Sequence, residues 1–274
     1  MKSLIKAKLL LMLWLVILPG CTTTPITGRK QFIVVPESII NSMSYQEYNN
    51  FLAENKLSQN LQHTQMVKDV GSNIQKAVDQ YCAQNYMYER IRGYQWEFNL
   101  VEDPNVNAWA MPGGKVVVYS GMIPVAQDEA GLAVVMGHEI AHVFARHGSE
   151  RMSQGLLAEF GSIALSTALK THPEKTRELF MQAYGIGTQV GYLLRYSRIH
   201  ENEADHLGLI FMAMAGYNPE EAVDFWQRMD EKSKGAQPPE FLSTHPAHDT
   251  RIQNIKSHLP EAMRYYQKKI NYSN

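Results

Sequence analysis

The sequence predicts an α+β protein that is mainly α-helical, with one small antiparallel sheet. Apolar residues recur every three or four positions along most of the 274-residue chain, which indicates helices. Strict alternation is confined to residues 96–119, which indicates a few short strands just before a strongly apolar helix. With 45% hydrophobic and 19% charged residues, the composition is ordinary for one globular domain. A formal net charge of −1 gives no basic field, so nucleic acid is not an expected partner.

The first 20 residues are set apart and predict a signal peptide. Three lysines precede an apolar run at Leu9–Leu18, which is too short to span a bilayer. Leu18-Pro19-Gly20-Cys21 resembles a bacterial lipobox, so Cys21 is the expected lipidation site; an uncleaved N-terminal anchor is the alternative. Either reading places the remaining chain outside the cytoplasm and on a membrane. Because Thr22 and not aspartate follows the cysteine, the sequence resembles outer-membrane lipoproteins.

Residues 21–37 are expected to form a lipidated tether, and residues 38–274 the folded domain. Two helices at about 38–54 and 61–84 should provide scaffold, because both carry apolar residues at helical spacing. If Cys21 carries lipid, Cys82 has no disulfide partner, and the fold rests on its core alone.

The β segment precedes the apolar helix directly. Residues 96–101 alternate as a half-buried strand, and two extended runs around Pro112-Gly113-Gly114 predict a hairpin. A free sheet edge beside a peptidase site can hold an extended substrate by strand addition, although the hairpin could equally be plain architecture. The candidate substrate-binding residues are Asn107, Ala108, Trp109, Ala110 and Met111.

The apolar helix, expected between Pro124–Asp128 and His147-Gly148, contains His138-Glu139-x-x-His142. Residues at i and i+4 share a helix face, so the two imidazoles can bind one metal ion while Glu139 reaches a water on it. The alternative is a buried helix whose histidines only form hydrogen bonds, but it leaves three polar groups without evident partners. His147 does not share this face and is interpreted as a helix-end residue or a support for the ligands.

A third ligand is expected on another helix, because a catalytic zinc site has three protein ligands and one open position. Glu201 and Asp205 are four residues apart and share a face. Glu201 is the candidate ligand, although spacing alone leaves a surface glutamate equally acceptable. Asp205 would hydrogen-bond a ligand imidazole. His200 and Glu203 are expected to be solvated.

Residues 150–195 predict a helical hairpin broken at Thr171-His172-Pro173. Several glycines in this stretch are compatible with close helix packing or with a lid over the site, and the sequence does not decide between these two interpretations.

Three motifs occur in order. They are the His138–His142 motif, Ser197-Arg198-x-x-Glu201-x-x-Ala204-Asp205, and Thr244-His245-Pro246 followed by Arg251. Together they resemble the HtpX-like family of zinc metallopeptidases, which includes the prenyl-protein endopeptidases and periplasmic BepA-like and LoiP-like enzymes. The segments 107–114 and 25–29 resemble its lipoprotein and mitochondrial (OMA-type) branch.

The resemblance implies a gluzincin-type metallopeptidase domain with one Zn²⁺ per chain. The ion would be held by His138, His142 and Glu201, with Glu139 as catalytic base and Arg198, like Asp205, in support of the ligands. The resemblance places His245 near the metal. This histidine could stabilise the transition state, or occupy the fourth zinc position as a latch, or simply cap the last helix.

The expected function is that of a zinc metalloendopeptidase of the bacterial cell envelope. It would act on the periplasmic side, anchored by lipid to the outer membrane. Its partners would be polypeptide substrates, namely unfolded or misassembled envelope proteins, including outer-membrane proteins. The alternative is a non-proteolytic assembly factor or chaperone that keeps a zinc site. Because Glu139 and all three candidate ligands are present, the sequence favours catalysis.

Overall fold

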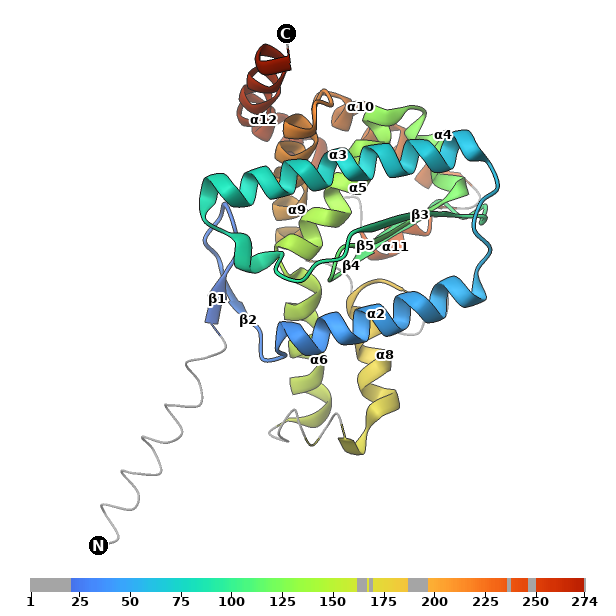
Figure 1. The fold of residues 1–274 in the computed structure, drawn as a ribbon, viewed down its shortest axis with the longest axis vertical. Coiled ribbons are helices and arrows are strands. Elements are labelled where there is room, and N and C mark those ends of the chain that lie inside the picture. The colour runs from blue at the N-terminus through green and yellow to red at the C-terminus, as the bar shows by residue number, and fades with distance from the viewer. Residues whose placement is uncertain are drawn as a thin grey trace, which may run out of the picture.

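The computed structural model describes residues 21–161, 167, 170–186, 197–235, 238–245 and 250–273, so the predicted signal peptide lies outside the described residues. The fold is mainly helical with a small sheet, which confirms the predicted fold class (Figure 1). Among the described residues, no helix combines the length and apolarity needed to cross a bilayer.

The helices agree with the predicted scaffold at the start of the domain and differ from it around the histidine motif. The α-helices are α2 (Glu37–Glu54), α3 (Leu61–Asn85), α4 (Ile123–Ala126), α5 (Glu129–Phe144), α6 (His147–Phe160), α8 (Pro173–Ala183), α9 (Arg198–Ala215), α10 (Glu221–Ser233), α11 (Phe241–Thr244) and α12 (Arg251–Ser273). Two short 3-10 helices, η2 (Tyr88–Arg90) and η3 (Ser120–Met122), complete the helical elements among the described residues.

The predicted helix over residues 124–147 is in fact three pieces. Gln127 separates α4 from α5 with a φ of 70°, and Arg146 separates α5 from α6 with a φ of 60°. Gly148 therefore lies inside α6 and not beyond a helix end, which corrects the predicted boundary. A β-carbon on Gly148 would lie 2.1 Å from the Tyr184 ring, so this glycine permits close packing of the α6 turn.

The sheet consists of β3 (Glu97–Val101), β4 (Ala108–Met111) and β5 (Lys115–Tyr119) in the order β3-β5-β4. The predicted antiparallel hairpin is confirmed, with Trp109 opposite Val117. β3 runs parallel to β5, so the sheet is mixed. The sequence did not predict the pairing of β3 with β5. Hairpin signals identify only strands that follow each other directly, and here β5, the last of the three strands, lies in the centre of the sheet.

Both faces of the sheet are covered, and each face belongs to a separate apolar core (Figure 1). One face, with Phe98, Leu100 and Val116, packs in the same core as α3, α5 and α9. The opposite face, with Trp109 and Val117, packs with α2, α6 and α8. Each large apolar side chain removed from water in this way contributes about 1.5–3 kcal/mol. The sheet is thereby fixed against α5.

Helices α5 and α9 approach each other closely where two glycines meet. A β-carbon on Gly208 would lie 3.0 Å from the backbone nitrogen of His138, and one on Gly137 would lie 3.1 Å from the carbonyl oxygen of Gly208. Neither position leaves room for a side chain without displacement of backbone. This contact brings the first turn of α9 beside the two histidines of α5.

The segment 21–37, which was predicted to be a tether, begins with a β-hairpin that packs on the domain. β1 (Cys21–Thr23) pairs antiparallel with β2 (Lys30–Phe32), and the connecting turn uses positive φ values at Ile26 and Gly28. The side chain of Gln31 is buried and donates to the carbonyl oxygen of Ala145, at the end of α5. We refer to residues 21–32 as the N-terminal hairpin.

Helices α6 and α8 pack against each other, as expected for a helical hairpin after α5. The break at Thr171-His172-Pro173 is also observed, since α8 begins at Pro173. The choice between a lid and close helix packing stays open, because the stretch concerned includes residues 187–196, which lie outside the described residues.

Candidate metal centre

Four buried side chains from three parts of the chain converge on one point. They are His138, His142, Glu201 and His245, and one ligand atom from each lies within 4.8 Å of all the others. The Nε2 atoms of His138 and His142 are 3.0 Å apart. Oε1 of Glu201 is 3.3 Å from Nε2 of His142 and 3.1 Å from Nδ1 of His245. The three predicted ligands are therefore brought together, with His245 beside them.

Each helix that supplies these ligands begins at a side-chain cap. Asp128 accepts a hydrogen bond from the backbone N–H of Gly131 and so starts α5. Ser197 accepts from the backbone N–H of His200 and starts α9, three residues before Glu201. Such caps contribute about 1 kcal/mol each and fix the register in which the helix presents its side chains.

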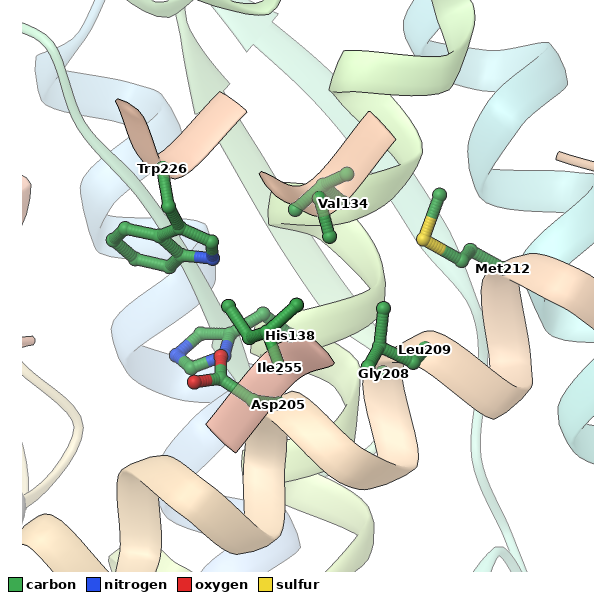
Figure 2. A pocket seen from close by; sticks show the side chains of 9 residues that line it. Val134, His138, Asp205, Gly208, Leu209, Met212, Trp226 and Ile255 are labelled. Atoms are coloured by element: carbon green, nitrogen blue, oxygen red, sulfur yellow. The ribbon is translucent and has the colours of Figure 1, made fainter. Parts of the chain in front are cut away.

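His138 is oriented by a carboxylate behind it. Its Nδ1 lies 2.9 Å from Oδ1 of Asp205, as predicted for this aspartate, and Figure 2 shows the two groups facing each other next to Trp226. The pocket drawn there is small, about 10 Å³, and mostly apolar. Burial lowers the pKa of His138, but the hydrogen bonds with Asp205 and Glu201 outweigh this and raise it to about 9.

Arg251 lies against the same carboxylates. Its Nη2 is 2.7 Å from Asp205 and its Nη1 is 3.0 Å from Glu201, while the guanidinium stacks 3.3 Å above the centre of the Trp226 ring. Although burial alone would raise the pKa of Glu201, His245 and Arg251 hold it well below its ordinary value. Glu201 is therefore ionised, as a metal ligand must be.

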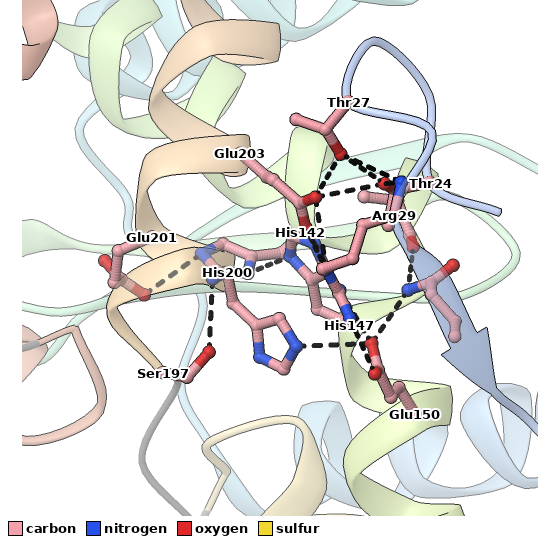
Figure 3. Close-up of polar contacts among 12 residues, drawn as sticks. Thr24, Thr27, Arg29, His142, His147, Glu150, Ser197, His200, Glu201 and Glu203 are labelled. Carbon is pink, nitrogen blue, oxygen red and sulfur yellow. Dashed lines mark hydrogen bonds and ion pairs between the residues drawn. The ribbon is translucent and has the colours of Figure 1, made fainter.

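His142 is supported from the other side by His147. The two Nδ1 atoms are 2.9 Å apart, and Nε2 of His147 lies 3.0 Å from Glu203 (Figure 3). A continuous helix would turn residue 147 away from this face; the left-handed Arg146 bends the chain so that His147 lies behind His142. Burial lowers the pKa of His147 to about 4, so its imidazole is neutral at pH 7.

The expectation that His200 and Glu203 are solvated is wrong. His200 is 6% exposed and Glu203 is 3% exposed, because the N-terminal hairpin covers this side of α9. The helical spacing alone could not reveal a covering segment whose Arg29 lies 174 residues earlier in the chain.

Arg198 is not brought to the ligands. It is exposed at the first position of α9, whereas the arginine in contact with Glu201 and Asp205 is Arg251. The sequence offered a signal for Arg251, since it completes the motif that begins at Thr244. The alternative in which His245 only caps the last helix does not match its position, six residues before Arg251, where α12 begins.

Glu139 faces the same space from the next position on α5. Burial raises its pKa, and the nearby His245 and His138 offset part of this rise. Its Oε1 lies 3.3 Å from Nε2 of His245. A buried carboxylate with a raised pKa, next to ligand atoms, has the properties of a general base that operates near neutral pH.

The predicted substrate-binding strand lies beside Glu139. The backbone of Ala110 is close enough to Glu139 to lower the pKa of its carboxyl slightly, and the N–H of Ala108 donates to Oδ1 of Asn107 at 2.9 Å. Neither contact is with β5, so alternate backbone groups of β4 point away from the sheet. Trp109 and Met111 instead direct their side chains into the core shared with α2.

The residues present fit a divalent metal ion. Both imidazoles have an outer partner at Nδ1, so in its neutral form each ring directs the Nε2 lone pair inward, next to the ionised carboxylate of Glu201. A metal ion between these atoms would replace the proton that the raised pKa of His138 holds there. Inward lone pairs and a carboxylate repel one another unless a cation lies between them. Two imidazole nitrogens and one carboxylate oxygen form a donor set found in catalytic metal sites.

A helix with two histidines one turn apart, a glutamate from a second helix and an adjacent glutamate base define the class of gluzincin-type metallopeptidases. The family model for peptidase family M48 matches residues 71–259. The chain belongs to this family, and the predicted resemblance to HtpX-like metallopeptidases is confirmed.

Mitochondrial and bacterial proteases are among the similar proteins. Mitochondrial metalloendopeptidase OMA1 of Saccharomyces cerevisiae is 35% identical over 185 residues, covering 65% of this chain and 51% of that protein. OMA1 of Homo sapiens is 30% identical over 249 residues, covering 88% of this chain and 46% of that protein. The beta-barrel assembly-enhancing protease of Yersinia pestis is 31% identical over 170 residues, covering 59% and 34%. The chain thus spans about half the length of the OMA1 proteins.

We predict that Arg251→Met lowers the affinity for Zn²⁺, used as probe ion, by about 10- to 100-fold, as is usual when a partner of the ligands is removed. The variant should also be less stable by about 3–5 kcal/mol, because Glu201 and Asp205 would lose a buried counter-charge. Chelator competition and thermal unfolding would measure the two effects. Arg264→Met, at an exposed position of the same helix, is the matched control. Zinc affinity equal to that of the control would contradict the prediction.

Proposed function

We propose that this protein is a zinc-dependent endopeptidase. The observation that carries the proposal is the position of Glu139, whose buried carboxylate borders both the His138–His142–Glu201 group and β4, which is an edge strand of the sheet in the described part of the chain. A metal site alone would fit a structural role. A metal site with a base and an unpaired strand at the same place is the arrangement that peptide hydrolysis requires.

The residues take distinct roles in this proposal. His138, His142 and Glu201 hold the zinc ion, which when bound supplies an activated water and polarises the scissile carbonyl. Glu139 accepts the proton of the water and later delivers it to the leaving amine. The backbone of Ala110, close to Glu139, would set the distance between an extended substrate and this base.

The substrate would lie along β4 as an additional strand. The outward N–H and carbonyl groups of Ala108 and Ala110 offer hydrogen bonds that do not depend on substrate sequence. In the free protein the N–H of Ala108 donates to the side chain of Asn107, which a substrate carbonyl would have to replace. Such a site suits chains that are already extended or unfolded.

We further propose that the protein works in the bacterial cell envelope, on the periplasmic side, anchored to the outer membrane through a lipid on Cys21. The basic and apolar start of the sequence and the lipobox-like Leu18–Cys21 support this location. The name of the Yersinia pestis relative, which refers to beta-barrel assembly, supports unfolded or misassembled outer-membrane proteins as substrates. The OMA1 relatives are named as mitochondrial, so the family itself does not fix the compartment.

We predict that the purified full-length protein cleaves an unfolded protein such as casein, and that a zinc chelator abolishes cleavage. Glu139→Gln should bind zinc with similar affinity but lose at least about 10³-fold in kcat, because the amide can no longer accept the proton. Glu261→Gln, a carboxylate on α12 that pairs with His206, is the matched control and should cleave normally. A wild-type protein that binds one zinc ion per chain without cleaving any unfolded chain would favour the assembly-factor alternative.

His245 is proposed to act as a latch in the free protein, because its Nδ1 lies among the ligand atoms and its Nε2 faces Glu139. We predict that His245→Ala binds substrate more readily and cleaves casein faster than wild type at low substrate concentration. If His245 instead donates to the transition state, the same variant loses about 10²- to 10³-fold in kcat. Steady-state kinetics therefore separate the two roles by the sign of the change.

Strand addition makes a prediction about the substrate backbone. Once a cleavage site in a short peptide has been mapped, a single N-methyl group would be placed on successive residues around it. Because alternate N–H groups of an added strand face β4, kcat/KM should fall about tenfold or more at every second position on one side of the scissile bond. The intervening positions serve as internal controls. A uniform effect at all positions would contradict strand addition.

A further inference from the structure

The two candidate histidine ligands are supported by different chains of hydrogen bonds. Nδ1 of His138 contacts the carboxylate of Asp205, whereas Nδ1 of His142 contacts the imidazole of His147, which in turn contacts the carboxylate of Glu203. A histidine in this intermediate position is not needed to fill space, since an apolar ring would do so at less cost in a site where all of these groups are buried.

The position of each proton follows from the chemistry of the ligand. A histidine that binds metal through Nε2 is neutral and carries its proton on Nδ1. The Nδ1–H of His142 therefore donates to Nδ1 of His147, 2.9 Å away. His147 must then carry its own proton on Nε2, where it donates to Oε2 of Glu203 at 3.0 Å. The carboxylate of Glu203 thus sets the direction of both hydrogen bonds.

Glu203 is in turn held by the N-terminal hairpin. Thr24 donates to Oε1 of Glu203 at 3.0 Å, Thr27 donates to the same oxygen, and Nη2 of Arg29 lies 3.1 Å from Oε2 (Figure 3). Arg29 also forms a two-pronged pair with Glu150 at 2.8 Å. One guanidinium therefore compensates two buried carboxylates from different helices, which a lysine could not do with the same geometry.

We propose that His147 is a positioning residue for His142, and that the N-terminal hairpin, through Arg29 and Glu203, completes the metal centre. The proposal rests on the proposed function in one respect, that His142 is a ligand of the zinc ion. It goes further in that residues 24–29, which touch no ligand, control how firmly the ion is held. The hairpin begins at Cys21, so these contacts connect the expected lipidation site with the metal site.

A purely structural role is the competing explanation. In that case the network serves only to satisfy buried charges, and its loss would lower stability without any specific effect on the metal. The two explanations differ in one measurable quantity, the zinc affinity of variants that remain folded.

The test uses the full-length protein, with Zn²⁺ as ligand and competition against a chromophoric chelator as readout. His147→Phe keeps the ring volume but removes both hydrogen bonds, and its zinc affinity should fall about 10- to 100-fold. His147→Asn places a carbonyl oxygen near the position of Nδ1 and should recover most of this loss. His206→Phe removes a histidine–glutamate pair between α9 and α12 and should bind zinc like wild type.

The hairpin is tested by Arg29→Met, alone and combined with His147→Phe. Because both residues act along one chain of contacts, the double variant should bind zinc no more weakly than the weaker single variant. Additive losses would overturn the link between Arg29 and His147. If Arg29→Met does not fold, Thr24→Val replaces it, and a loss of a few-fold in zinc affinity is expected. An unchanged affinity would overturn the role of the hairpin.

The outcomes distinguish this proposal from the proposed function. Wild-type affinity in His147→Phe, with lower thermal stability, would leave a structural role only and overturn the positioning role while cleavage by the wild type stands. A wild-type protein that binds no zinc would overturn both.

Discussion

The structure depends on the burial of one ionised carboxylate, that of Glu201. Its side chain is fully buried, and an unpaired carboxylate in such a place would cost several kcal/mol. The carboxylate lies 3.0–3.4 Å from four groups, which are His138 and His142 of α5, His245, and Arg251 of α12. The close contact of Gly137 with Gly208 and the path of α12 over α9 are therefore conditions for this charge to be tolerated.

The same logic extends outward from each imidazole. Behind His138 stand Asp205 and then Arg251; behind His142 stand His147, Glu203 and then Arg29. Each of these two series of polar contacts ends at an arginine, Arg251 near the end of the sequence and Arg29 near its beginning. Because an arginine is always charged and offers several fixed donors, it can end such a chain without a further partner. The polar contacts around the centre thus add to the apolar core that already holds α5 and α9 together.

The sequence predicts those parts of the site and the fold that depend on residues close together in the chain, and not those that depend on contacts between distant segments. His138, Glu139 and His142 were accessible from spacing alone, because i and i+4 must share a helix face. The scaffold helices and the β4–β5 hairpin followed from periodicity and turn residues for the same local reason. The surroundings of His147 and Glu203 could not be predicted, because a break at Arg146 and a covering hairpin from residues 21–32 decide them. The parallel pairing of β3 with β5 is likewise a long-range property.

The burial of the centre also bears on how a peptide would reach it. The His245 ring lies between Glu201, 3.1 Å from its Nδ1, and Glu139, 3.3 Å from its Nε2, and it stacks on Phe241. A carbonyl attacked by a water near Glu139 would have to occupy this same space. In the proposed latch, substrate and His245 compete for one position, and the apparent affinity for substrate would fall by the fraction of molecules in which His245 remains in place. An extended chain that gains hydrogen bonds along β4 can offset this cost, whereas a folded protein, whose strands are already paired, cannot.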